Sequence, residues 1–178
     1  GYLQYSDLFP NGDSNEWTVM ARASANIRSN RYILGWGAAS TYAGPHLGFR
    51  PTLNVTRLAV WGNGVIDVTS GVTDNNFHIW CADKSDSGVG RLVIDGELIG
   101  SGSINSSNLS SAGGYIGALP NGNSNWDGLV DYVFCWNRIL SDAERKSIEI
   151  NPPNAPIKNI YRDCWWWYNG SINWYSFS

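Results

Sequence analysis

The chain has little charge and few histidines. Only 15% of its 178 residues are Asp, Glu, Lys or Arg, and the net charge is -3. Because the sequence contains no basic stripe, binding to a nucleic-acid backbone has no electrostatic support. Its 2 histidines, His46 and His78, stand in no metal-ligand spacing, so neither predicts a zinc or metalloprotease site.

Long apolar runs are also missing. No stretch approaches the roughly eighteen apolar residues of a membrane-spanning helix, and the first residues lack the charged-then-apolar pattern of a secretion leader. We therefore expect no membrane span, and a leader that was either removed or never needed. A length of 178 residues fits one domain with a sizeable core.

Cysteine is scarce and odd in number. With 3 cysteines, Cys81, Cys135 and Cys164, at least one thiol has no disulfide partner within the chain. Their spacing nominates no pair and contains no C-x-x-C zinc motif. Cys135 alternates with Val133, which favours burial as a small apolar side chain. Whether any two of the cysteines pair stays open.

The sequence is rich in glycine, serine, asparagine and tryptophan, with 20 glycines and 10 tryptophans. Short alternating segments with almost no helix signal predict two packed antiparallel sheets. Asp95 and Gly96 predict the tip of a hairpin, because glycine tolerates the positive φ of a tight turn. The predicted strands are 17–23, 31–35, 47–51, 58–61, 65–68, 77–82, 91–94, 115–116 and 129–136.

Residues 113–145 predict a sheet edge that leads into a helix. A short strand at Tyr115 and Ile116 is followed by a polar loop, a longer strand from residue 128 and a turn. Ser141 and Glu144, three residues apart, form a capping box, in which each side chain bonds to the other residue's backbone N–H. The strand is therefore expected to end where a short helix begins.

The same segment resembles the end of laminin G-like, or concanavalin A-like, jelly-roll domains. Those domains carry a G-x-I-D strand and then N-R-x-L-S-x-x-E, which residues 126–131 and 137–144 match. Residues 76–80 resemble the family's W-H-H-x strand, and residues 90–96 its G-x-L-Y-V-D-G hairpin. The resemblance covers residues 16–150 and implies an all-β, antiparallel jelly-roll sandwich with one short C-terminal helix. Lectins, adhesion domains and glycan-degrading enzymes share this fold, so it specifies shape rather than activity.

We expect the jelly-roll domain to occupy residues 1–150 and an aromatic tail to occupy residues 151–178. The proline-rich start of the tail cannot continue a helix. Its aromatic side chains would leave a large apolar patch if exposed, so the tail is expected to pack on the domain or on a partner. A similar helix, N-P segment and aromatic tail end some laminin G-like structural proteins of bacteriophages. The candidate partner-interface residues are Trp165, Trp166, Trp167, Tyr168 and Trp174.

Catalysis has weak support. Glycan hydrolases of the resembled fold place carboxylates two residues apart on one strand, so that both share a face. The nearest pairs here are Asp95 with Glu97, which a turn glycine separates, and Asp127 with Asp131, of which Asp131 matches a structural position of the family. We therefore assign no catalytic residue and expect no enzyme activity.

No cofactor is expected, but calcium stays open. Several laminin G-like domains hold calcium at the rim of the sandwich, and loop aspartates supply the hard oxygen ligands that calcium prefers. The candidates are Asp74, Asp83, Asp86 and Asp127, whose spacing matches no known loop code. The sequence therefore assigns no ligand set.

Tryptophans near strand ends carry the remaining functional signal. Sugars present flat apolar faces beside hydroxyl edges, which suit an indole ring with polar neighbours. Trp36, Trp61, Trp126 and Asn125 are the candidate glycan-binding residues, although packing beneath a loop is the favoured interpretation for any one of these tryptophans. Trp17, Trp80 and Trp136 are interpreted as core or sheet-face residues.

These observations predict a non-catalytic surface recognition or structural module, glycan-binding or adhesive, at an extracellular surface or on a virion. Its expected partners are glycans or other surface proteins. The first alternative is a phage capsid or tail decoration protein that uses its tail for attachment, as a homo-oligomer or within the particle. The second is a divergent glycan hydrolase or lyase. N-x-S/T sequences begin at Asn54, Asn105, Asn108 and Asn169, and whether they carry glycans depends on the source.

Overall fold

The structure, a computed structural model, describes most of the chain. The described residues are 2–5, 16–25, 31–38, 44–50, 53–69, 72, 74–104, 113–150, 164–168 and 171–175. For residues 5, 164–168 and 171–175 it describes the backbone alone.

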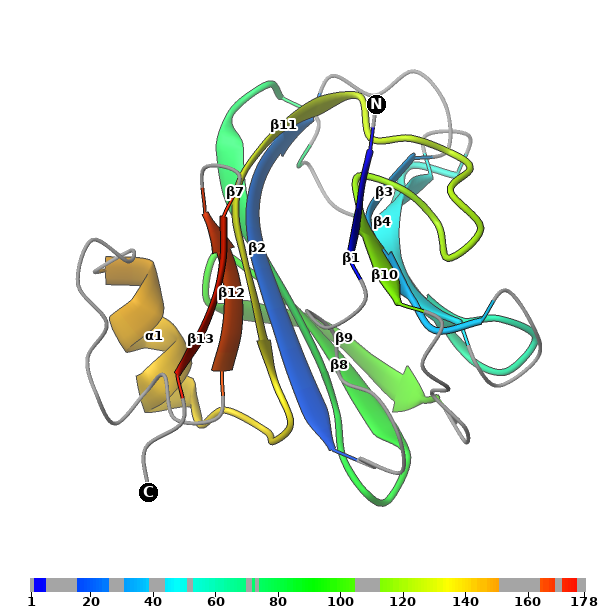
Figure 1. The fold of residues 1–178 in the computed structure, drawn as a ribbon. Coiled ribbons are helices and arrows are strands. Elements are labelled where there is room, and N and C mark those ends of the chain that lie inside the picture. The colour runs from blue at the N-terminus through cyan, green and yellow to red at the C-terminus, as the bar shows by residue number, and fades with distance from the viewer. Residues whose placement is uncertain are drawn as a thin grey trace.

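Two antiparallel sheets form a sandwich (Figure 1). The 6-stranded sheet has the order β1-β10-β3-β4-β5-β6, and the 7-stranded sheet has the order β13-β12-β11-β2-β7-β8-β9. This architecture confirms the predicted all-β jelly-roll sandwich. The bounds in the first sheet are β1 Leu3–Tyr5, β10 Gly114–Ile116, β3 Arg31–Trp36, β4 Pro45–Arg50, β5 Val55–Val60 and β6 Val65–Thr69. Those in the second are β13 Ser171–Tyr175, β12 Cys164–Tyr168, β11 Gly128–Trp136, β2 Trp17–Ala25, β7 Phe77–Lys84, β8 Val89–Ile94 and β9 Glu97–Ser103.

The main core lies between the sheets, because alternate side chains of each strand point inward. On β7, Trp80 and Ala82 belong to this core, whereas Cys81 belongs to a second cluster on the outer face, as the alternation predicts. Cys135 is also buried in the main core, as predicted, and Trp17 meets Trp36 there edge to face with 5.0 Å between ring centroids. Full burial of each such side chain contributes on the order of 2 kcal/mol.

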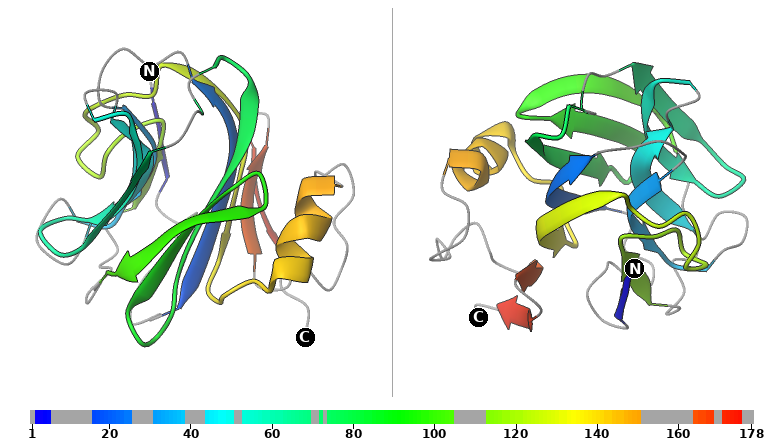
Figure 2. Two further views of the ribbon diagram at one scale, coloured as in Figure 1. Left: turned by 180° about the vertical axis from the view of Figure 1, so that it is seen from behind. Right: turned by 90° about the horizontal axis from the view of Figure 1, so that it is seen from above.

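Helix α1 (Asp142–Ile150) covers the outer face of the 7-stranded sheet (Figures 1 and 2). Its Ile148 packs with Met20, Phe134 and Trp136 in the second apolar cluster. The predicted capping box is present, since the Ser141 N–H donates to Glu144 at 2.8 Å and the Glu144 N–H donates to the Ser141 hydroxyl at 3.3 Å. The helix therefore begins where the sequence predicts.

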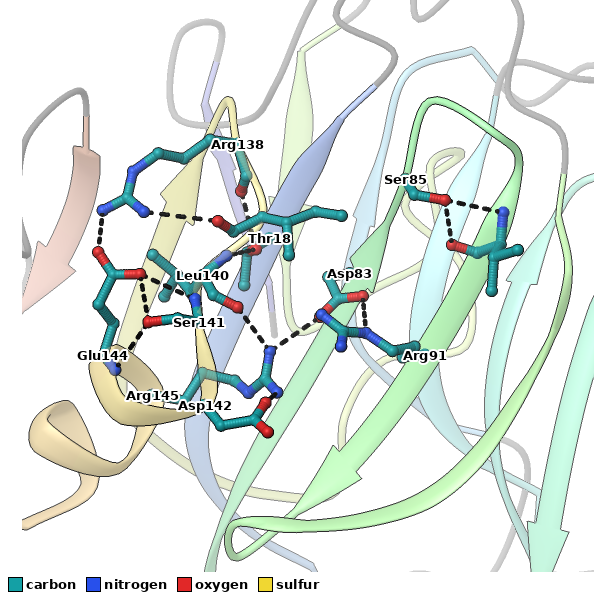
Figure 3. Close-up of polar contacts among 12 residues, drawn as sticks. Thr18, Asp83, Ser85, Arg91, Arg138, Leu140, Ser141, Asp142, Glu144 and Arg145 are labelled. Carbon is teal, nitrogen blue, oxygen red and sulfur yellow. Dashed lines mark hydrogen bonds and ion pairs between the residues drawn. The ribbon is translucent and has the colours of Figure 1, made fainter.

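An ion-pair network centred on the buried Asp83 and Arg145 side chains fastens the helix to the sheet (Figure 3). Asp83 on β7 is 1% exposed, and it accepts hydrogen bonds from Arg91 at 2.8 Å and from Arg145 at 3.2 Å. Arg145 also donates to the Leu140 carbonyl at 2.8 Å and pairs with Asp142. Because every charge in it is compensated, the network holds the helix at one position on the sheet.

Some predictions about strands need correction. The nine predicted strands exist, but β1, β9, β12 and β13 were not predicted. Residues 100–103 form the end of β9, and residues 105–112 lie outside the described part. Asp95 and Gly96 do form a hairpin tip, with φ values of 49° and 79°.

The aromatic tail supplies the last two strands of the 7-stranded sheet. β12 pairs with β11, so that Trp165 and Trp167 stand in register with Cys135 and Val133. β13 then pairs with β12. The proline-rich residues 151–156 lie outside the described part, and a domain boundary at residue 150 stays a prediction. Among the described residues, no helix has the length and apolar character that crossing a bilayer would require.

Candidate functional site

Polar side chains form a row across the outer face of the 6-stranded sheet. Tyr32, Gly48, Arg57 and Asp67 are successive register partners on β3, β4, β5 and β6. Because Gly48 has no side chain, the Tyr32 ring lies over it, and a Cβ there would stand 2.7 Å from the ring. The Arg57 guanidinium lies close enough to the Tyr32 hydroxyl to lower its pKa against the effect of burial. A glycine thus allows two side chains from non-adjacent strands to meet.

A second row forms the floor beside the first. His46 and Ala59 are register partners, followed by Val65 on β6. The segment after β10 packs against the same face of β3, since a Cβ on Gly35 would lie 2.6 Å from the Ala118 carbonyl oxygen. The rows and this segment enclose a depression with a volume of about 270 Å³, which we name the outer groove. It is lined by Tyr32, His46, Arg57, Ala59, Val60, Trp61, Gly62, Val65 and Leu119.

Trp61 stands at one end of the outer groove, at the start of the β5–β6 turn. Gly62 and Gly64 adopt φ values of 71° and 97°, which favour glycine. The backbone N–H of Trp61 donates to the Gly44 carbonyl at 3.1 Å. The Trp61 indole meets the His46 ring edge to face, with 6.3 Å between the ring centroids. The indole is half-buried. The turn therefore holds an aromatic ring at the edge of the groove while part of the ring stays open to solvent.

Arg57 and Asp67 form an ion pair at the other end. Arg57 donates from Nε to Asp67 at 2.7 Å and from Nη2 to the other carboxylate oxygen, and the side chains are 15% and 27% exposed. The hydrogen bonds to Asp67 raise the pKa of Arg57. Burial raises the pKa of Tyr32, although Arg57 opposes this effect. A guanidinium and a carboxylate are thus fixed side by side as donor and acceptor.

His46 is neutral at physiological pH. Burial lowers its pKa to about 4. The Nδ1–H group donates a hydrogen bond of 2.9 Å to the Gly44 carbonyl oxygen. Its ring also meets Tyr32 edge to face, with 5.0 Å between centroids. The floor of the outer groove therefore carries no charge of its own.

The predicted sugar-binding residues do not lie together. Trp61 lines the outer groove, whereas Trp36 is fully buried against Trp17, in line with the packing interpretation favoured for any one of these tryptophans. Trp126 is 7% exposed and donates from Nε1 to the Ser24 carbonyl at 2.9 Å. Asn125 forms a backbone bridge with Tyr32, next to the groove.

Trp126 borders a different depression. Its volume is about 310 Å³, and its lining is mainly apolar. Because Trp61 lines the outer groove and not this depression, the two tryptophans do not form one platform. The lining residues are Tyr2, Leu3, Ile116, Gly117, Trp126, Gly128 and Val130.

Two of the four carboxylates weighed for catalysis, Asp131 and Asp95, have structural partners. Asp131 pairs with Arg22 at 2.5 Å. Asp95 accepts from the Ile79 N–H at 2.8 Å and lies 2.6 Å from His78 Nδ1. Although partial burial disfavours the charged imidazole, its hydrogen bonds to Asp95 and Asp74 outweigh this effect and raise the pKa of His78. Asp95 and Asp131 thus serve local structure.

The aspartates weighed for calcium do not converge. Asp83 lies on a strand, buried against Arg91 and Arg145, which corrects its assignment to a loop. Within the part of the chain that the structure describes, no three His, Cys, Asp or Glu side chains gather as a group that could hold a metal ion. Calcium binding stays a prediction without a ligand set.

Sequence reasoning missed Tyr32, His46 and Arg57 of the outer groove, and Asp67, which pairs with Arg57 beside it. One signal was present, because Arg57 and Asp67 lie at equal distances from Gly62 at the centre of the turn. A hairpin centred there places the opposite charges across from each other. The contact between Tyr32 and Arg57 depends on the order of the strands, which no short motif encodes.

Three solved structures illustrate the likeness of this chain to known folds. A presumed carbohydrate binding protein from Bacteroides ovatus ATCC 8483 matches with a TM-score of 0.65 and 16% identity, over 87% of this chain and 45% of its own. A heptameric SAP-like pentraxin from Limulus polyphemus matches with a TM-score of 0.65 and 13% identity, over 97% of this chain and 87% of its own. The CBM40 of the Ruminococcus gnavus IT-sialidase, bound to α2,3-sialyllactose, matches with a TM-score of 0.61 and 12% identity, over 76% of this chain and 83% of its own.

At these identities the likenesses establish the fold alone. The chain spans less than half the length of the Bacteroides protein. Comparison with curated protein sequences gives no match. The family model described as the concanavalin A-like lectin/glucanases superfamily matches residues 1–144. Together with the sandwich, this match places the chain in the concanavalin A-like lectin/glucanase superfamily.

Proposed function

We propose that the protein is a non-catalytic carbohydrate-binding module and that the outer groove is its binding site. The observation that carries this proposal is the pairing of the half-buried Trp61 ring at one end of the groove with the Arg57–Asp67 ion pair at the other. An indole ring packs on the apolar face of a sugar, and a fixed donor and acceptor pair can bond to its hydroxyls.

The fold and its relatives support the same class of function. The names of two of the similar structures refer to a carbohydrate binding protein and a carbohydrate-bound module. A non-enzymatic role agrees with the engagement of Asp95 and Asp131 in structural contacts. We place the protein at an extracellular surface, where glycans and glycan-bearing proteins would be its partners. A virion role, with the tail as the attachment segment, stays the alternative proposal.

A glycan array tests the proposal. Trp61→Ala removes the aromatic end of the outer groove and is expected to abolish binding to every glycan that the unaltered protein retains. Phe77→Ala is the matched control, because Phe77 is an exposed aromatic residue on β7, in the other sheet. Equal binding by the Trp61→Ala variant and the unaltered protein would rule out the outer groove as the site.

A further inference from the structure

The charge balance of the outer groove bears on the chemistry of its ligand. Arg57 is neutralised by Asp67, which bonds to it through both carboxylate oxygens. His46 is uncharged because burial lowers its pKa to about 4. The other lining side chains are aromatic or aliphatic, apart from Gly62. The charges of the lining residues and Asp67 thus cancel, and one further charge, Arg50 on β4, acts on Tyr32 from outside the lining.

An acidic sugar would meet a repulsive neighbour in this site. Its carboxylate could approach Arg57 only beside the Asp67 carboxylate, and like charges at contact distance oppose binding. The chain also carries a net charge of -3, which gives an anion no long-range attraction. A neutral sugar has neither disadvantage.

The ion pair has the right chemistry for adjacent hydroxyl groups. Two of the five guanidinium N–H groups bond to Asp67, which leaves donors on Arg57 for a ligand oxygen. The Asp67 oxygens keep lone pairs for a ligand O–H. Each of two neighbouring hydroxyls can accept from Arg57 and donate to Asp67 without a change of protonation. The pair is positioned before binding, so little side-chain entropy is lost.

The size of the groove limits how much sugar it can hold. Its volume of about 270 Å³ lies just below the usual range of ligand pockets, which run from roughly 300 to 1,000 Å³. Trp61 stands at one end and the ion pair at the other, across a floor of His46 and Ala59. This shape fits one or two sugar rings rather than a long stretch of polysaccharide.

From these four observations, and on the basis of the proposed function, we infer that the outer groove recognises a short neutral glycan, or the end of one, through adjacent hydroxyls held by Arg57 and Asp67. Trp61 contributes apolar stacking that is common to many sugars. The ion pair contributes the discrimination between neutral and acidic sugars.

Calorimetric titration with two sets of probes tests this inference. The neutral set is lactose, cellobiose and mannobiose, and the acidic set is 3′-sialyllactose and digalacturonic acid. We expect at least one neutral disaccharide to bind more tightly than every acidic probe. Raising the NaCl concentration from about 50 to about 500 mM is expected to change its Kd by less than about twofold, because no net charge is neutralised on binding.

Asp67→Asn gives the sharpest variant. It keeps the shape of the side chain but leaves Arg57 without a compensating charge. We expect about a tenfold loss of affinity for the neutral sugar, since a charged acceptor is replaced by a neutral one, and a gain in affinity for the acidic probes. Asp86→Asn is the control, because Asp86 is an exposed residue outside the groove. Circular dichroism and thermal unfolding serve to check that both variants fold.

The outcomes separate this inference from the proposed function. Binding that depends on Trp61 but favours acidic probes, or an Asp67→Asn variant with unchanged selectivity, would overturn the inference and leave the proposed function standing. Failure of Trp61→Ala to affect the binding of any sugar would overturn both. Tighter neutral binding that Asp67→Asn reverses would support both.

Discussion

His46 shows how the fold dictates the charge of a single side chain. It is 7% exposed, and burial lowers its pKa to about 4, against 6.5 for an unperturbed imidazole. Between these values the unfolded chain binds a proton that the folded protein does not. The stability that neutral His46 contributes is therefore full above about pH 6.5 and is lost as the pH falls toward 4.

The corresponding variant is His46→Gln, which stays uncharged throughout. We expect protonation of His46 to lower the unfolding free energy of the unaltered protein by up to about 3 kcal/mol between pH 6.5 and 4. The variant should lose less stability over the same range. Urea unfolding at pH 7, 6, 5 and 4.5 measures the difference. If the unfolding free energies of the two proteins changed in parallel with pH, folding would not lower the pKa of His46, and the prediction would be wrong.

Arg145 is a second residue whose environment decides its role. It is 6% exposed and pairs with Asp83, which is 1% exposed. Arg145→Ala would leave the Asp83 charge buried with Arg91 as its remaining partner. We expect a loss of about 3 to 5 kcal/mol in unfolding free energy. Lys146→Ala is the control, because the exposed neighbouring side chain should change stability by less than about 0.5 kcal/mol. Equal losses in the two variants would contradict the role of the network.

Among the elements, helix α1 could be predicted from local sequence. The Ser141 and Glu144 capping box involves contacts three residues apart, and the hydrogen bond from Arg138 lowers the pKa of Glu144 to about 2. The Asp95-Gly96 turn was equally local. Strands β1 and β9 were missed because β1 is only three residues long and β9 contains two glycines, so neither shows a clear alternation.

Strands β12 and β13 lead to a prediction about the aromatic tail. β12 covers the edge of β11, a strand that carries Tyr132, Phe134 and Trp136. A variant that ends at residue 150 would expose this edge, which offers unpaired backbone groups to other chains. We expect its Tm to fall by at least about 5 °C and its tendency to self-associate to rise.

Differential scanning calorimetry and light scattering of the full and shortened chains check this prediction. The full chain provides the reference for both measurements. If the shortened chain stayed monomeric with an unchanged Tm while the full chain self-associated, the tail would be an attachment segment for a partner. That result would favour the virion-assembly alternative.

The fold was easier to predict from the sequence than the site, because the fold has local motifs whereas the site depends on contacts between distant residues. The jelly-roll likeness rests on motifs within residues 76–144, each of which is local. The outer groove instead depends on Gly48 lying between Tyr32 and Arg57, which requires the strand order β3-β4-β5. The glycine-rich turn beside Trp61 could be recognised in the sequence, whereas the burial of Trp36 depends on the opposite sheet.

The sandwich also divides its two outer faces between different tasks. The 7-stranded sheet is covered by α1 on its outer side, where a charged depression of about 440 Å³ lies between α1 and the turn from β8 to β9. The 6-stranded sheet keeps the outer groove accessible on its own outer face. Under the proposed function, recognition therefore takes place on the side of the core opposite the one that α1 covers.

A crystal structure of the protein with a bound neutral disaccharide tests the central claim most directly. We expect one sugar ring to stack on Trp61, with adjacent hydroxyls within hydrogen-bonding distance of Arg57 and Asp67. A disaccharide bound instead in the depression beside Trp126, with an empty outer groove, would contradict the account.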